Sequence, residues 1–465
     1  MVSDDPSDVG ASPRVVPYGV LMAERIVVIG GDAAGMTAIS PIMKRKPDAE
    51  IVALERGNWT SYSACGIPFL VGGVIDGGVD RLVARSPEQH RANGIDVRMR
   101  HEAVAIDTSA RTVDVRDLDG GLTYSLGFDH LMIGTGGRPI RPPLPGIDLP
   151  FIHGVQTLDD AAELLAAAER DPGRVVVVGG GYIGLEMAEA FLHRGCTSTV
   201  IDVGPYPLSL LDPELGQLVA DAMERHGVEL RPGTKVLGFE AGMVRTNHGD
   251  VPADLVILGI GVAPNSSLAA DAGIELGVKD SIRVDDRQET SVAGIWAAGD
   301  CAETTHLVSG EKVHIALGTY ANRHGRVAGV NIGGGSAHSQ RVLGTAVTKL
   351  CENEIGLTGL NSKQAAAAGF DAVGAVIEST TFAGYLPDAP PITVKFVFER
   401  GSGRLLGAQI VGGAGAAKRI DTCAVAITAG MNVEQIAELD FGYAPPFSPL
   451  WDPVAIAARE AQKYL

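Results

Sequence analysis

Short runs of apolar, β-branched residues alternate with glycine-rich turns and helical segments along the first two thirds of the chain. Residues 25–29 form such a run and lead into the segment 30–35, Gly-Gly-Asp-Ala-Ala-Gly, which an alanine-rich helical stretch follows. A second apolar run, 51–54, ends at Glu55. A strand, a glycine turn, a helix and a second strand ending in an acid about 20 residues on are typical of a dinucleotide-binding unit. The pattern predicts one such unit near the N-terminus.

The same pattern occurs a second time. Residues 174–178 lead into the segment 179–184, Gly-Gly-Gly-Tyr-Ile-Gly, and the next strand, 199–201, ends at Asp202. Glycine turns also occur for backbone reasons alone, but two copies with the same strand context and terminal acid favour nucleotide binding. The first copy has Asp32 in place of its second glycine, whereas the second copy keeps all three. We therefore expect two units, each holding a pyrophosphate at the start of its helix.

From about residue 340 the pattern changes to that of an antiparallel sheet. Residues 345–350 and 392–398 indicate strands, and residues 416–438 indicate a helix. The fold class predicted is α/β, with two Rossmann-like nucleotide-binding domains and a C-terminal α+β domain. The expected boundaries are a disordered extension at 1–22, a first nucleotide-binding domain at 23–150 and 266–338, a second at 151–265, and the C-terminal domain at 339–465.

Composition narrows the function classes. A net charge of −18 argues against a nucleic-acid partner, because no broad basic surface is available to neutralise phosphates. The chain has no apolar run of about 20 residues, so we expect no membrane span, and residues 1–22 do not have the pattern of a signal peptide. The five cysteines are scattered, without a CxxC pair or a Cys/His cluster. We therefore expect no metal and a reducing, cytoplasmic location.

Cys65 is the first candidate for redox chemistry. It stands among small residues in the segment 61–68, Ser-Tyr-Ser-Ala-Cys-Gly-Ile-Pro, shortly after Glu55. Its alternative role is that of an inert, buried thiol. No second cysteine follows within several residues, so a disulfide at Cys65 must form with a partner other than a near neighbour. Pro68 suits the first turn of a helix, and a helix that begins beneath Cys65 would lower the pKa of its thiol.

Taken together, these motifs resemble the pyridine nucleotide–disulfide oxidoreductase superfamily from residue 24 to the end of the chain. The single cysteine resembles the branch of coenzyme A-disulfide reductases, persulfide reductases and NADH oxidases or peroxidases. The resemblance implies that the first domain binds FAD, the second NAD(P)H, and the C-terminal domain forms a homodimer. It assigns to FAD Gly30, Ala33, Ala34, Gly35, Glu55, Arg56, Thr135, Gly136 and Asp300. It assigns to NAD(P)H Gly179, Gly181, Tyr182, Ile183, Gly184, Glu186, Asp202 and Gly261.

Two tyrosines sharpen the resemblance. The segment 441–447, Phe-Gly-Tyr-Ala-Pro-Pro-Phe, is similar to the Tyr-Ala-Pro-Pro motif of the coenzyme A-disulfide reductases, and Tyr385 falls where that group has another catalytic tyrosine. The resemblance implies that Tyr443 and Tyr385 reach Cys65 from the partner subunit and donate a proton to a leaving thiolate. Taken singly, each would be an ordinary packing tyrosine.

Three positions depart from the patterns of related groups. Ala64 stands where coenzyme A-disulfide reductases usually have Asn, which leaves substrate contacts open. Ala33 stands where NADH oxidases and peroxidases have His, which counts against peroxide chemistry. Leu70 stands where the enzymes with two redox cysteines have the second one, which excludes reduction through an internal disulfide.

Several smaller interpretations remain. Lys44 and Arg45 are either a solvated helix end or a clamp for coenzyme A phosphates, and Ser61 is a further coenzyme A candidate. Asp202 favours NADH over NADPH because it repels a 2′-phosphate, although it could instead cap a turn. Glu186 resembles the family's nicotinamide-contacting glutamate and is otherwise an ordinary helix acid.

The function predicted is an FAD-dependent NAD(P)H oxidoreductase that reduces coenzyme A disulfide, or coenzyme A persulfide or polysulfide. Cys65 would pass through a mixed disulfide with coenzyme A. One alternative is an NADH oxidase in which Cys65 cycles through a sulfenic acid and oxygen or peroxide is the acceptor. Another, of a different class, is a flavin-bound redox sensor or electron-transfer protein.

Overall fold

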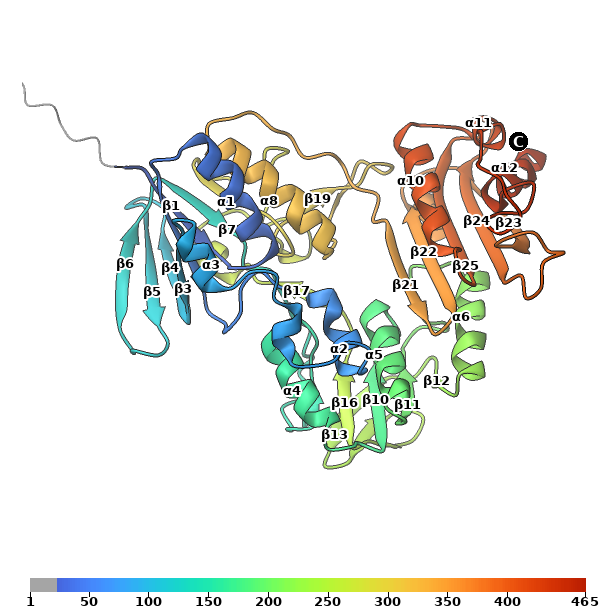
Figure 1. The fold of residues 1–465 in the computed structure, drawn as a ribbon, viewed down its shortest axis with the longest axis horizontal. Helices are drawn as coiled ribbons and strands as arrows, with labels where there is room; N and C mark the ends of the chain where they lie inside the picture. Colours follow the sequence, from blue (N-terminus) through green and yellow to red (C-terminus); the bar gives the residue numbers. More distant parts are fainter. Residues whose placement is uncertain (1–22) are drawn as a thin grey trace, which may run out of the picture.

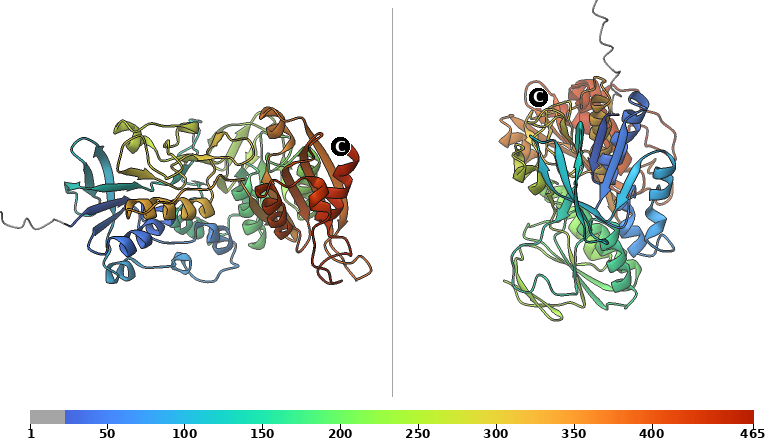
Figure 2. Two further views of the ribbon diagram at one scale, coloured as in Figure 1. Left: turned by 90° about the horizontal axis from the view of Figure 1, so that it is seen from above. Right: turned by 90° about the vertical axis from the view of Figure 1, so that its left-hand side faces the viewer.

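The structure is a computed structural model that describes residues 23–465, so the disorder predicted for residues 1–22 lies outside it. The chain forms three units, each built around its own five-stranded sheet. Figures 1 and 2 show the C-terminal unit at one end of the molecule and an antiparallel sheet of the first unit at the other. No helix within residues 23–465 is long and apolar enough to cross a membrane.

The first unit has a parallel sheet of strand order β18-β7-β1-β2-β3. Its strands are buried on both faces, because helices cover one face and a second sheet covers the other. The parallel strands are β1 (Arg25–Ile29), β2 (Glu50–Glu55), β3 (Asp96–Met99), β7 (His130–Ile133) and β18 (Ile295–Ala297). The covering elements are α1 (Ala33–Arg45) and α8 (Gly318–Ile332) on one face, and β4 (His101–Asp107), β5 (Thr112–Asp117) and β6 (Thr123–Gly127) on the other.

The second unit repeats this arrangement with the strand order β12-β11-β10-β16-β9. Its parallel strands are β9 (Ile152–His153), β10 (Arg174–Val178), β11 (Thr197–Ile201), β12 (Glu229–Arg231) and β16 (Leu255–Leu258). The helices are α4 (Leu158–Ala168), α5 (Tyr182–His193) and α6 (Pro213–Arg225), and the small sheet is β13 (Val236–Glu240), β14 (Met243–Thr246) and β15 (Val251–Pro252). The chain passes between the first and second units twice, near β8 (Gly137–Pro139) and near β17 (Val262–Pro264). These two strands pair antiparallel.

The C-terminal unit is an antiparallel sheet of order β21-β22-β25-β24-β23. Its elements are β21 (Ala346–Leu350), β22 (Asn353–Gly359), α9 (Ser362–Ala367), β23 (Ala372–Thr380), β24 (Pro391–Glu399), β25 (Leu405–Gly412), α10 (Ile420–Thr428), α11 (Val433–Ala437) and α12 (Pro453–Ala461). The single helix predicted for residues 416–438 is wrong. Gly430, at φ +68°, ends α10 and separates it from α11.

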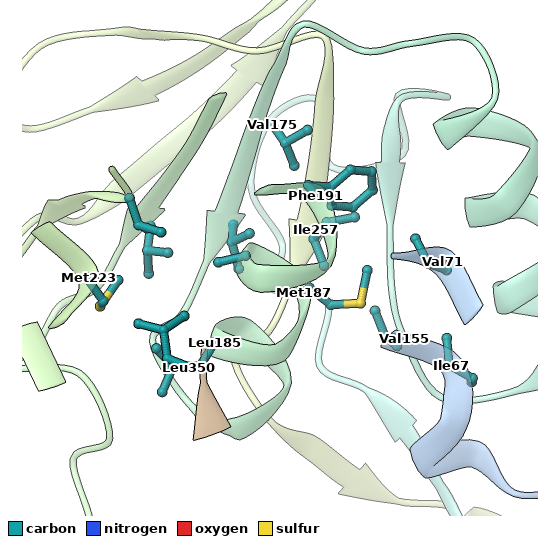
Figure 3. Packing of buried hydrophobic residues seen from close by; sticks show 14 of the residues in the cluster. Ile67, Val71, Val155, Val175, Leu185, Met187, Phe191, Met223, Ile257 and Leu350 are labelled. Atoms are coloured by element: carbon teal, nitrogen blue, oxygen red, sulfur yellow. The ribbon is translucent and has the colours of Figure 1, made fainter. Parts of the chain in front are cut away.

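Helix α2 (Ile67–Val71), which follows Cys65, packs against α4 and α5 of the second unit. Figure 3 shows Ile67 and Val71 facing Val155 and Met187 in one continuous apolar cluster. The segment that carries the cysteine therefore leaves the first unit and is held in place by the second. The remaining elements are α3 (Pro87–Ala92), α7 (Ser267–Asp271), β19 (Thr304–Thr305) and β20 (Lys312–Val313).

Candidate active site

The two glycine turns have the same geometry. The first glycine of each lies at positive φ, +107° at Gly30 and +101° at Gly179. A Cβ at Gly30 would lie 2.1 Å from the carbonyl oxygen of Gly134, and one at Gly179 would lie 2.5 Å from that of Gly259. Only glycine permits both the positive φ and this close approach of a neighbouring strand end.

The last glycine of each turn lets the helix pack tightly on the turn itself. A Cβ at Gly35 would lie 2.0 Å from the carbonyl oxygen of Gly30, and one at Gly184 would lie 1.9 Å from that of Gly179. Neither position has room for a methyl group, because the obstructing atom in each case is backbone. Gly35 and Gly184 therefore allow the first turn of each helix to lie directly against the backbone of the glycine turn.

The two terminal acids bind their turns in the same way. One carboxylate oxygen of Glu55 accepts a hydrogen bond from the Gly31 N–H at 2.8 Å, and the other accepts one from the Gly57 N–H at 2.6 Å. Asp202 accepts from the Gly180 and Gly204 N–H groups, both at 2.6 Å. Burial raises the pKa of Glu55 above its usual range, although these N–H donors oppose the shift.

One cavity of about 2220 Å³ joins both turns to Cys65. It is large enough for two dinucleotides lying along the two turns, and each turn opens into it. The residues predicted to bind cofactors that line it are Gly30, Ala33, Ala34, Glu55, Arg56, Thr135, Gly136, Asp300, Gly179, Gly181, Tyr182, Ile183, Glu186, Asp202 and Gly261.

The residues present fit these two groups. Asp300 lines the cavity, where its carboxyl oxygens can accept hydrogen bonds from ribityl hydroxyls. Burial raises its pKa, so hydrogen bonds from such hydroxyls would stabilise its ionised form. The hydroxyl of Tyr182 is buried without a hydrogen-bond partner and also lines the cavity. Buried polar groups are ordinarily hydrogen-bonded, so this hydroxyl fits a partner on a nucleotide bound at the second turn.

Asp32 has a role that the motif alone did not reveal. Its carboxylate accepts a hydrogen bond from the backbone N–H of Tyr62 at 3.1 Å, and the Ser61 N–H donates to the carbonyl oxygen of Gly31 at 3.0 Å. The first turn therefore anchors the loop that carries Cys65. Burial raises the pKa of Asp32 to about 6.

Cys65 lies in a single 3-10 turn, Ala64–Gly66, directly before α2. Of the five cysteines, it is the one that lines the cavity. The prediction that the protein groups around Cys65 lower the pKa of its thiol is wrong. Cys65 is exposed to the open cavity, but the atoms packed around its sulfur partly desolvate it and raise its pKa, and the carboxylates of Glu186 and Asp300 raise it further.

Leu70 explains why no internal disulfide forms. Its side chain is 1% exposed and belongs to the apolar cluster that holds α2 against the second unit. The position that carries a second cysteine in other enzymes is therefore used here for packing.

Glu186 is held in the cavity wall by the C-terminal unit. Its carboxylate accepts a hydrogen bond from the Thr348 hydroxyl at 3.0 Å, and burial raises its pKa. One helical turn further on, Glu189 pairs with Lys349. Consecutive residues of β21 thus fix two acids of α5, an arrangement that sequence spacing could not indicate.

Tyr385 and Tyr443 do not line the cavity of their own chain. They lie on two loops of the C-terminal unit, joined by a hydrogen bond from the Ala383 N–H to the Pro445 carbonyl oxygen at 3.0 Å. Both side chains are exposed, and the neighbouring Tyr443 hydroxyl raises the pKa of Tyr385. The two tyrosines, predicted from separate segments, therefore lie side by side, but neither lines the cavity that contains Cys65 of the same chain.

Arg419 fixes both tyrosine loops. Its guanidinium donates to the carbonyl oxygen of Thr381 at 2.7 Å and to that of Phe447 at 3.0 Å, one in each loop. It also pairs with the largely buried Asp452 at 2.9 Å. Sequence reasoning missed this residue, because its partners come from distant segments.

The three coenzyme A candidates lie outside the cavity. Lys44 and Arg45 are exposed at the last turn of α1, the end of that helix remote from the glycine turn. The hydroxyl of Ser61 is paired with Nε2 of the buried His90 at 2.9 Å.

A second group of polar residues on α8 was not predicted. Asn322 lines the cavity and accepts a hydrogen bond from the Thr37 hydroxyl of α1 at 2.7 Å. Arg323 and Arg326 are exposed on the same helix, and neither forms an ion pair with any residue that the structure describes. Within residues 23–465, no group of three or more potential metal ligands occurs.

Comparison with known proteins matches residues 24–325 to the pyridine nucleotide-disulphide oxidoreductase model, and residues 345–453 to the dimerisation domain of the same family. The NAD(P)H coenzyme A polysulfide/persulfide reductase of Pyrococcus horikoshii is 38% identical over 95% of this chain and 99% of that protein. The NADH oxidase of Methanocaldococcus jannaschii is 36% identical, also over 95% of this chain and 99% of that protein.

Solved structures agree. Reduced CoADR-RHD of Bacillus anthracis has a TM-score of 0.92 at 32% identity, over 95% of this chain and 80% of that chain. The NAD-dependent persulfide reductase of A. fulgidus has a TM-score of 0.91 at 37% identity, over 94% of this chain and 83% of that chain. The chain therefore belongs to the pyridine nucleotide-disulphide oxidoreductase family, whose enzymes use FAD and NAD(P)H.

Proposed function

We propose that this protein is an FAD-dependent NAD(P)H reductase of coenzyme A disulfide, or of coenzyme A persulfide or polysulfide. The observation that carries the proposal is that Cys65, without a second cysteine beside it, shares one cavity with both glycine turns. The Pyrococcus relative, whose name states a coenzyme A polysulfide/persulfide reductase, supports the same substrate class.

The two turns divide the cofactors. Glu55, Asp300 and the first turn would hold FAD, while Asp202, Glu186 and the second turn would hold NAD(P)H. When bound, FAD accepts a hydride from NAD(P)H, passes two electrons to a disulfide, and stabilises a neighbouring thiolate. That last contribution matters here, because the protein groups around Cys65 raise its pKa.

Cys65 performs the exchange with the substrate. Its thiolate attacks one sulfur of coenzyme A disulfide, so that the mixed disulfide Cys65–S–S–CoA forms and one coenzyme A thiolate leaves. Two electrons then cleave the mixed disulfide and return the Cys65 thiolate with a second coenzyme A thiolate. Each leaving thiolate takes up one proton. NAD(P)H thereby supplies both electrons, and one disulfide yields two thiols.

We also propose that the protein acts as a homodimer in which each subunit completes the other's site. The tyrosine pair is exposed and outside its own cavity, so it is available to a second copy. Large apolar side chains gather on the same loops with high exposure, namely Phe447, Leu450 and Trp451. In such a dimer, Tyr443, paired with Tyr385, would donate the proton to the leaving thiolate.

The phosphates of coenzyme A need cations. We propose that α1 and α8, which pack side by side, supply them through Lys44 and Arg45 together with Arg323 and Arg326. All four side chains are exposed, and Asn322 of α8 places this surface next to the cavity. Ser61 remains a further candidate for the end of the ligand near Cys65.

The domain boundaries follow the crossings between units. We divide the chain into an FAD domain at 23–150 and 266–338, an NAD(P)H domain at 151–265 and a dimerisation domain at 339–465. The paired strands β8 and β17 support the division, because they form the two connections between the first and second sheets.

Oxidase activity is the second candidate, and the similarity to the Methanocaldococcus NADH oxidase favours it. Cys65 would then cycle between thiolate and sulfenic acid, with oxygen or peroxide as the acceptor. Ala33 in the first turn offers no acid or base for that chemistry.

Anaerobic turnover separates the two candidates. The flavin-loaded enzyme should oxidise NADH without oxygen when coenzyme A disulfide, coenzyme A persulfide or polysulfide is supplied. Cys65→Ser should abolish this reaction while NADH still reduces the bound flavin. Cys351→Ser, a half-exposed cysteine outside the cavity, is the matched control and should leave the rate unchanged. NADH consumption only in the presence of oxygen would refute the proposal.

Tyr443→Phe tests the dimeric site. It should slow turnover by about a hundredfold, because general acid catalysis is lost, while flavin reduction by NADH stays at the wild-type rate. An unchanged turnover rate would remove Tyr443 from the mechanism.

A further inference from the structure

The end of the cavity beyond Asp202 contains a lysine that no motif predicted. Lys235 lines the cavity together with Asp202, Val203, Gly204 and Ser209. In the part of the chain that the structure describes, it is the one cation lining the cavity beside Asp202, and its side chain is exposed. A cation next to an acid at the ribose position bears directly on which nucleotide can bind.

Backbone hydrogen bonds place Lys235 beside the acid. The Thr234 N–H donates to the carbonyl oxygen of Asp202 at 2.9 Å, and the Gly233 N–H donates to that of Gly204, also at 2.9 Å. The segment from 233 to 235 therefore runs alongside the segment from 202 to 204.

Asn247 fixes the backbone of Lys235 from the other side. Its side-chain oxygen accepts from the Lys235 N–H at 2.7 Å, and its own N–H donates to the Lys235 carbonyl oxygen at 3.1 Å. These two bonds hold the backbone of Lys235 in place. Its ammonium group forms no ion pair with any residue from 23 to 465 and is available to a ligand. The neighbouring cation, Arg231, is by contrast paired with Glu229 at 2.8 Å.

The charge of Asp202 is already partly satisfied. Each of its carboxylate oxygens accepts a backbone N–H at 2.6 Å, from Gly180 and from Gly204. The positive ends of these two N–H dipoles lie against the carboxylate and offset part of its repulsion of a nearby phosphate, although the group keeps its negative charge. An uncommitted lysine beside it can then offset what remains.

We propose that Lys235 is a specificity-determining residue that allows the second nucleotide site to accept a 2′-phosphate, so that NADPH binds as well as NADH. Asp202 retains its acceptor role toward the 2′-hydroxyl of NADH, while Lys235, with the hydroxyl of Ser209 nearby, binds the 2′-phosphate of NADPH. The inference rests on the proposed assignment of this end of the cavity to the pyridine nucleotide.

Equilibrium binding tests it without relying on turnover. Dissociation constants of NAD⁺ and NADP⁺ for the flavin-loaded protein are measured by titration calorimetry at low and high salt. Lys235→Met should weaken NADP⁺ binding about tenfold and NAD⁺ binding less than about twofold. Lys235→Arg should preserve NADP⁺ binding. The wild-type affinity for NADP⁺ should also fall more steeply with salt than that of Lys235→Met.

Lys363→Met, which removes an exposed lysine outside the cavity, is the control and should change neither constant. Equal weakening of both nucleotides by Lys235→Met, or no change in either, would overturn the role of Lys235 while leaving the nucleotide site intact. A wild-type protein that binds neither nucleotide would instead overturn the assignment of the site itself.

Discussion

The two nucleotide-binding units share the same backbone arrangement around their glycine turns but differ in the side chains that the turns supply. In each, a loop after the second strand is tied to the glycine turn by an equivalent hydrogen bond, from Ser61 N–H to Gly31 at 3.0 Å and from Leu208 N–H to Gly180 at 2.8 Å. The units differ at the next residue of the turn. Asp32 adds a side-chain bond to the loop, whereas Gly181 has no side chain to offer.

The extra hydrogen bond that Asp32 accepts comes from the loop that carries Cys65. A loop that only borders a nucleotide needs the backbone bond alone. The loop that carries Cys65 has a second anchor, and its following helix is packed into the other unit. The departure of Asp32 from the glycine motif is therefore part of how the sulfur of Cys65, the proposed redox group, is positioned.

The largest loss of cofactor binding is expected from a substitution that disrupts the glycine turn of one unit at a time. Gly35→Ala places a methyl group 2.0 Å from a backbone oxygen of the first turn, and Gly184→Ala places one 1.9 Å from the equivalent oxygen of the second. We expect Gly35→Ala to yield protein without flavin. Gly184→Ala should retain flavin, measured by its absorbance, but lose NAD⁺ binding, measured by calorimetry.

Gly127→Ala is the control for this pair, because the nearest atom to its Cβ would be 4.0 Å away. Loss of flavin in Gly184→Ala with NAD⁺ binding retained would reverse the assignment of the two units.

A smaller effect is expected from giving the second turn the acid of the first. Gly181→Asp has room, since the nearest atom to a Cβ there is 3.7 Å away. A carboxylate at this position would face the pyrophosphate of the pyridine nucleotide, so we expect NAD⁺ affinity to fall by more than about tenfold. Flavin content should not change. An unaltered dissociation constant would show that the pyrophosphate does not pass this residue.

The reciprocal change, Asp32→Gly, removes the second anchor of the cysteine loop. We expect turnover with coenzyme A disulfide to fall about tenfold, because loss of one hydrogen bond costs on the order of 1 kcal/mol in positioning. Flavin reduction by NADH should be unaffected, as stopped-flow spectroscopy would show. A variant with full turnover would mean that the backbone bond to Gly31 holds the loop by itself.

A further prediction concerns the pH dependence of stability, through the same aspartate. Burial raises the pKa of Asp32 from 3.8 to about 6, so ionisation opposes folding. The favourable contribution of the neutral carboxyl is complete below pH 3.8 and is lost as the pH rises through 6. Asp32→Asn keeps an acceptor for Tyr62 and cannot ionise. Relative to wild type, the free energy of unfolding of Asp32→Asn should rise by at most about 3 kcal/mol between pH 4 and pH 7.5.

Thermal unfolding of flavin-free protein across this pH range measures the gain. Asp117→Asn gives a control of opposite sign, because hydrogen bonds from Gly120 and Asp119 lower the pKa of Asp117. Its stabilising contribution is present above the unfolded pKa and is lost as the pH falls. A difference between Asp32→Asn and wild type that does not vary with pH would contradict the account.

The sequence predicted the glycine turns, the strands and the terminal acids because these features are local. Gly30, Gly35 and Glu55 act on neighbours within one unit, so their spacing alone indicates their roles. The helix break at Gly430 was missed because a single glycine is also tolerated inside helices.

The rest depends on contacts between distant segments. Asp32 meets Tyr62 across thirty positions of the chain. The pKa of Cys65 is raised by burial and then by the carboxylates of Glu186, from the second unit, and Asp300, from a distant segment of the first unit. Arg419 and Lys235 likewise act through neighbours that only the folded chain brings together. No spacing rule along the sequence could have identified these partners.

The mass of the intact oxidised protein shows whether Cys65 forms a mixed disulfide with coenzyme A. Protein purified in air without reductant should carry one coenzyme A per chain in disulfide linkage to Cys65. The adduct should disappear on treatment with a reductant and be absent from Cys65→Ser. A protein whose Cys65 carries only added oxygen, or no adduct under any oxidising condition with coenzyme A present, would contradict the account.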